Sequence, residues 1–104
     1  MLKTFVRENS WLKFTDTGWG NGYVCLPVGH KYHGVGYNDI PVEVHGGLTF
    51  SEPAKDCNWP EIPEGSQDSW IIGFDTSHYG DTSSNWPLER LQQETENLAN
   101  QLMA

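Results

Sequence analysis

Every histidine in the chain lies in one of three short segments that also hold glycines or acidic residues: GHKYHG (29–34), VEVHGG (42–47) and GFDTSHYGD (73–81). The third presents Asp75, His78 and Asp81 in the spacing D-x-x-H-x-x-D after an apolar run. Neutral imidazole and carboxylate oxygen are ligands that Zn, Mn and Fe accept. With His45 as a fourth ligand, these residues predict a divalent-metal site. A water on such an ion would serve a metal-dependent hydrolase, which is one alternative function.

The same acidic segment allows two interpretations without a metal. Asp75 can close a turn by accepting a hydrogen bond from the backbone N–H of Ser77 or His78. The histidine and the acids can also carry out acid–base chemistry alone. A nucleophile has little support: burial in an apolar strand would raise the thiol pKa of Cys25. Catalytic residues therefore remain unassigned.

The second segment places His45 before Gly46 and Gly47. A histidine at a strand end can act as a general base. The two glycines would let a phosphate or carboxylate approach exposed backbone amides. The alternative is a β-bulge, with His45 on a solvated face beside Glu43.

The first segment begins a loop that offers His30, Lys31, Tyr32 and, farther on, Tyr37. Aromatic faces stack on nucleobases, and a lysine can meet a phosphate. An ordinary glycine-rich turn with inward tyrosines is the alternative. Because each segment lies where a strand gives way to a turn, we expect one pocket for a small polar, nucleotide-like ligand. Its interior would hold His45, Asp75, His78 and Asp81, and its rim Tyr32 and Tyr37.

The elements that position these residues follow from hydrophobic periodicity. We expect strands at 2–7, 11–14, 23–28, 40–45 and 69–74, of which 69–74 is apolar enough to be central. In the segment 40–45, Ile40, Val42 and Val44 share one face. Residues 51–68 carry three prolines and five acids and predict a long surface loop.

A C-terminal helix is expected over 86–103. Pro87 suits its first turn, with Asn85 or Trp86 as the cap. Its apolar stripe consists of Leu88, Leu91, Thr95, Leu98 and Leu102. The stripe can pack on the sheet or on a second copy in a homo-oligomer. Together the elements predict one α+β domain over 1–104, with a mostly antiparallel sheet of four to six strands and one C-terminal helix.

Charge narrows the classes of partner. The chain of 104 residues has 14 acidic and 6 basic side chains, a formal charge of -8. General nucleic-acid binding is disfavoured, because it depends on Lys and Arg displacing counterions. The chain contains no run of about 18 apolar residues, so no membrane span is predicted. We therefore expect a cytoplasmic protein. An acidic surface also suits an inhibitor that docks on a basic partner protein.

The motifs VEVHGGLTF and IGFDTSHYGD, with the C-terminal helix, resemble a small protein family found in phages and prophages. The resemblance covers residues 22 to about 102. It implies an accessory phage protein in the host cytoplasm that counters host defence, by binding or cleaving a nucleotide signal or by binding a host defence protein. It assigns no catalytic residue.

Overall fold

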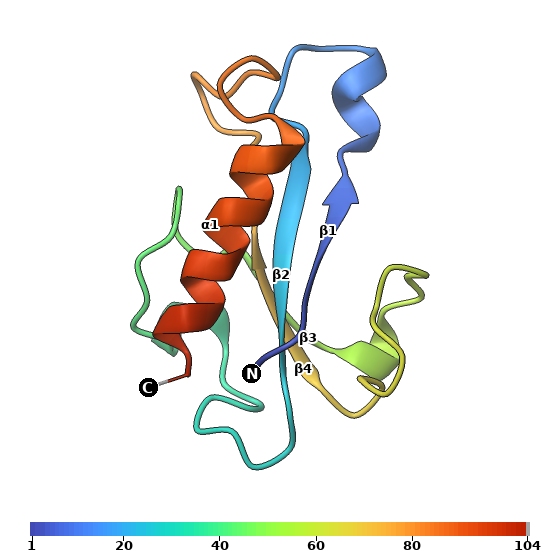
Figure 1. Ribbon diagram of the computed structural model, residues 1–104, viewed down its shortest axis with the longest axis vertical. Helices are drawn as coiled ribbons and strands as arrows, with labels where there is room; N and C mark the ends of the chain where they lie inside the picture. The colour runs from blue at the N-terminus through green and yellow to red at the C-terminus, as the bar shows by residue number, and fades with distance from the viewer. Residues whose placement is uncertain (104) are drawn as a thin grey trace.

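A computed structural model of the chain describes residues 1–103. Four strands form one antiparallel sheet in the order β1-β2-β4-β3, and one helix packs on it (Figure 1). The elements are β1 (Thr4–Glu8), β2 (Gly20–Leu26), β3 (Phe50–Pro53), β4 (Trp70–Phe74) and α1 (Leu88–Gln101). Short 3-10 helices lie at η1 (Ser10–Lys13), η2 (Tyr37–Asp39) and η3 (Ala54–Asp56). The expected α+β class and C-terminal helix are confirmed, and β4 is an inner strand.

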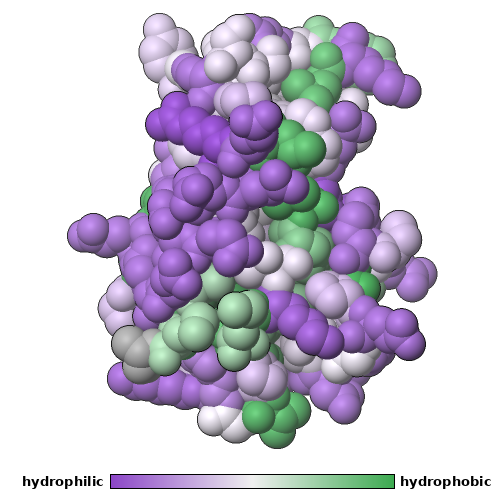
Figure 2. Space-filling model, viewed as in Figure 1, coloured by the Kyte–Doolittle hydropathy of each residue, from purple (hydrophilic) through white to green (hydrophobic). Residues whose placement is uncertain are grey.

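Helix α1 covers one face of the sheet. Its Leu91 and Leu98 are fully buried and pack with Val24 of β2 and Ile72 of β4. Full burial of such a side chain stabilises the fold by about 1.5–3 kcal/mol. The exposed face of α1 is mainly hydrophilic (Figure 2). The stripe therefore packs on the sheet through Leu91, Leu98 and Leu102, which are buried there, and a homo-oligomer stays a prediction.

The start of the helix differs from expectation. Helix α1 begins at Leu88, and Pro87 occupies the N-cap position in place of Asn85 or Trp86. Trp86 is 4 % exposed, and the Asn85 side chain accepts a hydrogen bond from the Thr82 backbone N–H instead. No helix within residues 1–103 is long and apolar enough to cross a membrane.

The opposite face of the sheet has its own cover. Phe5, Tyr23 and Ile71 form a second apolar cluster, on which Trp59 and Ile62 pack. Part of the expected surface loop 51–68 therefore caps the core, and its first three residues belong to β3. Cys25 lies in this cluster as a free thiol, and burial raises its pKa to about 11.

The expected strand at 11–14 is wrong. Residues 10–13 form η1, because Asn9 caps it: the Asn9 side chain accepts a hydrogen bond from the Trp11 backbone N–H. Trp11 and Phe14 are 63 % and 78 % exposed and stack edge-on against each other, with ring centres 6.3 Å apart. They do not pack into the core.

The expected strand at 40–45 is also wrong, although the predicted alternation of its side chains between core and solvent is present. Ile40 is buried and Val42 and Val44 pack against the same core. The backbone, however, bonds to side chains of α1. Gln101 bonds to both the N–H and the carbonyl of Glu43, at 2.8 and 2.7 Å, and Glu94 accepts from the His45 N–H at 2.9 Å. Segment 40–45 therefore lies against the helix as an extended chain outside the sheet.

Candidate metal centre

Two of the three histidine segments meet beside the β4–α1 connection. His45 Nε2 lies 2.9 and 3.0 Å from the two carboxylate oxygens of Asp81. His78 Nδ1 lies 3.1 Å from Asp81 Oδ2, which also accepts the His78 backbone N–H at 2.9 Å. Both imidazoles therefore point a ring nitrogen at one carboxylate.

The Asp81 carboxylate is held in its ionised form. Its side chain is 6 % exposed, and burial by itself would raise its pKa. The hydrogen bonds from the His45 ring and from the His78 backbone and ring outweigh that effect and lower the pKa below its usual 3.8. At neutral pH the Asp81 carboxylate is therefore ionised and accepts hydrogen bonds from both histidines.

Asp75 faces the other side of the His78 ring. Its Oδ1 lies 3.4 Å from His78 Nε2 and accepts the Ser77 backbone N–H at 3.1 Å. The expected turn closure by Asp75 is therefore present, together with a contact that orients His78. A histidine that binds a metal commonly directs its second ring nitrogen to such a carboxylate.

His45 is positioned by its own turn and by aromatic packing. The Gly47 backbone N–H donates to the Val44 carbonyl at 2.8 Å, and the His45 ring stacks on Trp86 with centres 4.3 Å apart. Gly46 has φ +69°, and any Cβ there would overlap the His78 ring. The glycines therefore serve a turn and the close approach of Gly46 to the His78 ring, and exposure of their amides to a ligand stays a prediction.

The three side chains have the chemistry of a metal centre. One ligand atom from each of His45, His78 and Asp81 lies within 4.8 Å of the others. Around a tetrahedral Zn²⁺ with bonds near 2.0–2.1 Å, neighbouring ligand atoms lie about 3.3 Å apart. The His45–Asp81 and His78–Asp81 distances of 2.9 and 3.1 Å are a few tenths of an ångström shorter than that value. Asp75, which was also expected to be a ligand, instead contacts the Nε2 side of the His78 ring.

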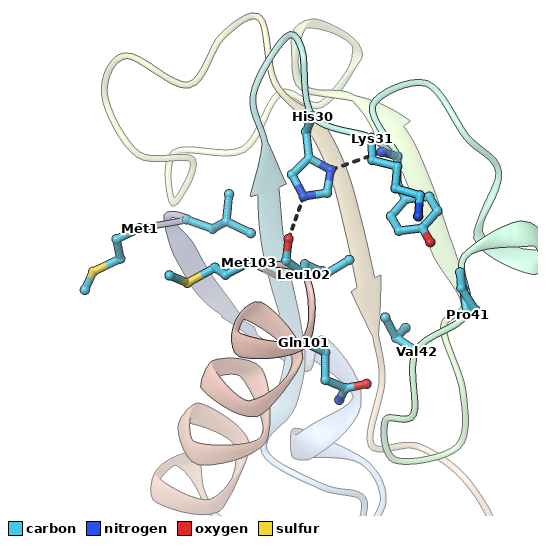
Figure 3. Close-up of a pocket in the computed structure, with 10 residues that line it drawn as sticks. Met1, His30, Lys31, Pro41, Val42, Gln101, Leu102 and Met103 are labelled. Atoms are coloured by element: carbon cyan, nitrogen blue, oxygen red, sulfur yellow. Dashed lines mark hydrogen bonds between the residues drawn. The ribbon is translucent and has the colours of Figure 1, made fainter.

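The first histidine segment lies elsewhere. His30 Nε2 donates to the Leu102 carbonyl at 2.7 Å, and its Nδ1 accepts the Tyr32 backbone N–H at 3.0 Å. Figure 3 shows this ring bridging the loop and the end of α1, at a groove of about 470 Å³. Lys31 lines the groove, with Nζ 5.3 Å from the centre of the Tyr32 ring.

One shared pocket is therefore not formed. Strands β2 and β4 are antiparallel, so the segments that follow them leave opposite edges of the sheet. His30 lies at the C-terminal end of α1 and Trp86, which stacks on His45, precedes its start, with a helix of 14 residues, about 21 Å long, between them. Tyr37 lies in η2, where its backbone N–H donates to Ser51 Oγ. It does not line the groove.

Sequence reasoning missed two residues that build the centre. Trp86 was expected only as a helix cap, and Glu94 was not singled out. Glu94 immediately precedes Thr95 of the apolar stripe, so its side chain leaves the helix beside the face that packs on the sheet. A polar residue beside the stripe could have indicated a hydrogen bond to a neighbouring segment, and Glu94 makes one to the His45 backbone N–H.

Comparisons with protein-family models, with curated proteins and with solved structures found no match. The resemblance to phage proteins stays a prediction.

Proposed function

We propose that the protein binds a divalent transition-metal ion through His45, His78 and Asp81, and that the ion holds a small polar ligand. One observation carries the proposal: two imidazole nitrogens converge on the same buried carboxylate. Such a triad supplies three ligands of the types that Zn, Mn and Fe accept.

The exposure of the centre supports a ligand-binding role for the ion. The side chains of His45 and His78 are 27 % and 36 % exposed, whereas that of Asp81 is 6 % exposed. An ion among them would be anchored on the protein side and open on the solvent side. Zinc sites with three protein ligands keep a fourth position for water or substrate.

Charge indicates which ligand would occupy that position. Two neutral histidines and one carboxylate leave a divalent ion with one net positive charge. The chain as a whole carries -8, so the ion would be a local positive site on an acidic protein. Phosphate or carboxylate oxygens are the matching ligand chemistry.

Cobalt titration tests the metal site directly. We expect one Co²⁺ per chain, with the visible absorption of a tetrahedral centre, and a loss of affinity of at least about tenfold in His45→Ala and in His78→Ala. His33→Ala is the matched control, because the His33 ring bonds to the Asp68 backbone carbonyl and to none of the three proposed ligands.

Two outcomes would contradict the proposal. The first is a wild-type protein that takes up well under one ion per chain. The second is an equal loss of affinity in the His33 variant, which would place the binding outside the centre. A phosphate titration of the Co²⁺-loaded protein then tests the ligand: a change in the cobalt spectrum is expected, and an unchanged spectrum would refute ligand binding at the ion.

A further inference from the structure

Asp75 also lines a separate cavity, which His78 does not line. It has a volume of about 400 Å³ and is lined by residues of β1, η1, β2 and the start of the β4–α1 connection. The residues that give it chemical character are Arg7, Glu8, Trp11, Asn21 and Asp75. It includes none of the three proposed ligands, although Asp75, which lines it, contacts His78.

An unpaired polar atom marks this cavity. Asn21 stands opposite Arg7 in the β1–β2 register, and its Nδ2 donates to Tyr23 Oη at 3.3 Å. Its Oδ1 is buried and has no hydrogen-bond partner within residues 1–103. Buried polar groups in native proteins are nearly always paired. Asn21 lines the cavity, so a ligand that donates a hydrogen bond would supply the missing partner once the Asn21 side chain turns toward it.

The charges around the cavity favour a cation. Glu8 and Asp75 contribute carboxylates, and both contacts of Asp75 described above use Oδ1, so Oδ2 remains for a ligand. Arg7 is the cation of the lining, but its Nε bonds to Glu61 at 3.1 Å and its guanidinium lies 4.3 Å from the Trp59 ring centre. Because Arg7 is paired, the two carboxylates dominate.

An aromatic wall completes the cavity. Trp11 lines it, although 63 % of the residue is exposed to solvent. An indole face attracts organic cations, and it stacks well on the planar guanidinium group. The fold keeps this large apolar side chain in water at the mouth of an acidic cavity.

We propose that this cavity binds a ligand through a guanidinium group. That group is flat enough to stack on Trp11, and its several N–H donors match the acceptors of Asn21, Asp75 and Glu8. The group would belong either to a small free guanidino compound or to an arginine side chain of a partner protein. Binding at this cavity does not depend on the metal centre.

Nuclear magnetic resonance of EDTA-treated, ¹⁵N-labelled protein tests the proposal, with agmatine as the probe. We expect saturable shifts of the Trp11 indole and Asn21 side-chain amide signals. N-carbamoylputrescine, in which a neutral urea replaces the guanidinium, is the matched control and should bind at least about tenfold more weakly. Absence of saturable shifts with agmatine, or equal binding of the neutral compound, would overturn the proposal.

Two variants locate the binding. Asn21→Ala and Glu8→Gln should each weaken agmatine binding severalfold, whereas Asp39→Asn, which removes an exposed acid in η2, should leave it unchanged. Asn21→Ala should fold nearly as stably as the wild type, because the hydrogen bond it removes, from Nδ2 to Tyr23 Oη, is long at 3.3 Å, and it also removes an unpaired buried acceptor. Unchanged affinity in both cavity variants would refute the site. A Gly-Arg-Gly peptide then distinguishes the sources: tighter binding than agmatine assigns the group to a partner's arginine, and weaker binding assigns it to a free compound.

Discussion

Histidines lie beside both ends of α1, but their rings are bonded differently. Both nitrogens of His30 are bonded to backbone groups, the Leu102 carbonyl and the Tyr32 N–H. His45 and His78 instead share one side-chain carboxylate at the other end. A ring whose two nitrogens are taken by the main chain fixes the fold. Rings that converge on one side-chain carboxylate can exchange that contact for an ion.

Removal of Asp81 should produce the largest difference between the two ends. In Asp81→Ala, His45 and His78 lose their common acceptor, and hydrogen bonds to a charged group are worth about 1.5–3 kcal/mol each. Discounting for the partly exposed rings, we expect a loss of about 2–4 kcal/mol in urea unfolding, together with complete loss of Co²⁺ binding. Asp75→Ala is the control and should cost less, because its contact to His78 is longer, at 3.4 Å. Unchanged stability of Asp81→Ala would contradict the assignment of Asp81 as the anchor of the cluster.

Alanine variants of two glycines separate the effect of the His78 ring position on metal affinity from the effect of backbone strain on stability. Gly46 and Gly47 both have positive φ, at +69° and +80°, so alanine is strained at either position. Only at position 46 would the new Cβ overlap His78. We expect Gly46→Ala to weaken Co²⁺ binding by about tenfold, or about 1.4 kcal/mol, and Gly47→Ala to lower stability while retaining affinity. Equal affinities in the two variants would show that the His78 position does not limit binding.

Acid should weaken the Asp81 end selectively. Because the folded-state pKa of Asp81 lies below 3.8, its carboxylate stabilises the fold above that pH, and this contribution is lost as pH falls through the folded-state pKa. The stability difference between wild type and Asp81→Ala should therefore shrink below about pH 4. Urea midpoints between pH 2.5 and about 7 measure it. A difference that stays constant with pH would mean that Asp81 ionisation does not contribute.

The His30 end should give the smallest effect. His30→Ala removes two hydrogen bonds to the main chain, each worth about 0.5–1.5 kcal/mol. We expect a loss of about 1–2 kcal/mol on thermal unfolding and unchanged Co²⁺ affinity. A metal-binding defect in this variant would indicate that the two ends are coupled through α1.

The helix was predictable from its periodic apolar stripe, and the inner strands from continuous apolar runs that are buried on both faces of the sheet. The segment 40–45 shows where periodicity stops being informative: alternation reports which side chains face the core, but not what bonds to the backbone. In this chain Gln101 and Glu94 replace a neighbouring strand. At 10–13, the Asn9 cap prevailed over a pattern of apolar side chains.

The sequence predicted the part of the candidate site formed by His45 and residues 75–81, but it wrongly joined the loop of His30 to it, and the reason is the sheet topology. Asp75, His78 and Asp81 are close in sequence, and His45 reaches them through an ordinary turn. His30 and Tyr32 were grouped with them on the assumption that strand ends lie side by side. That assumption fails for β2 and β4, because antiparallel partners end at opposite edges.

The hydrogen bonds between α1 and residues 40–45 also have a consequence for the order in which parts of the molecule unfold. This segment is attached by side chains of Gln101 and Glu94, whereas the sheet is held by a ladder of main-chain bonds. Segments with fewer main-chain bonds open at lower free energy than a central sheet. We expect His45 to leave with this segment in a partial opening, while His78 and Asp81 stay together beside α1. The complete centre would then form only when this segment closes, and a bound ion would fasten the segment to the rest of the described molecule.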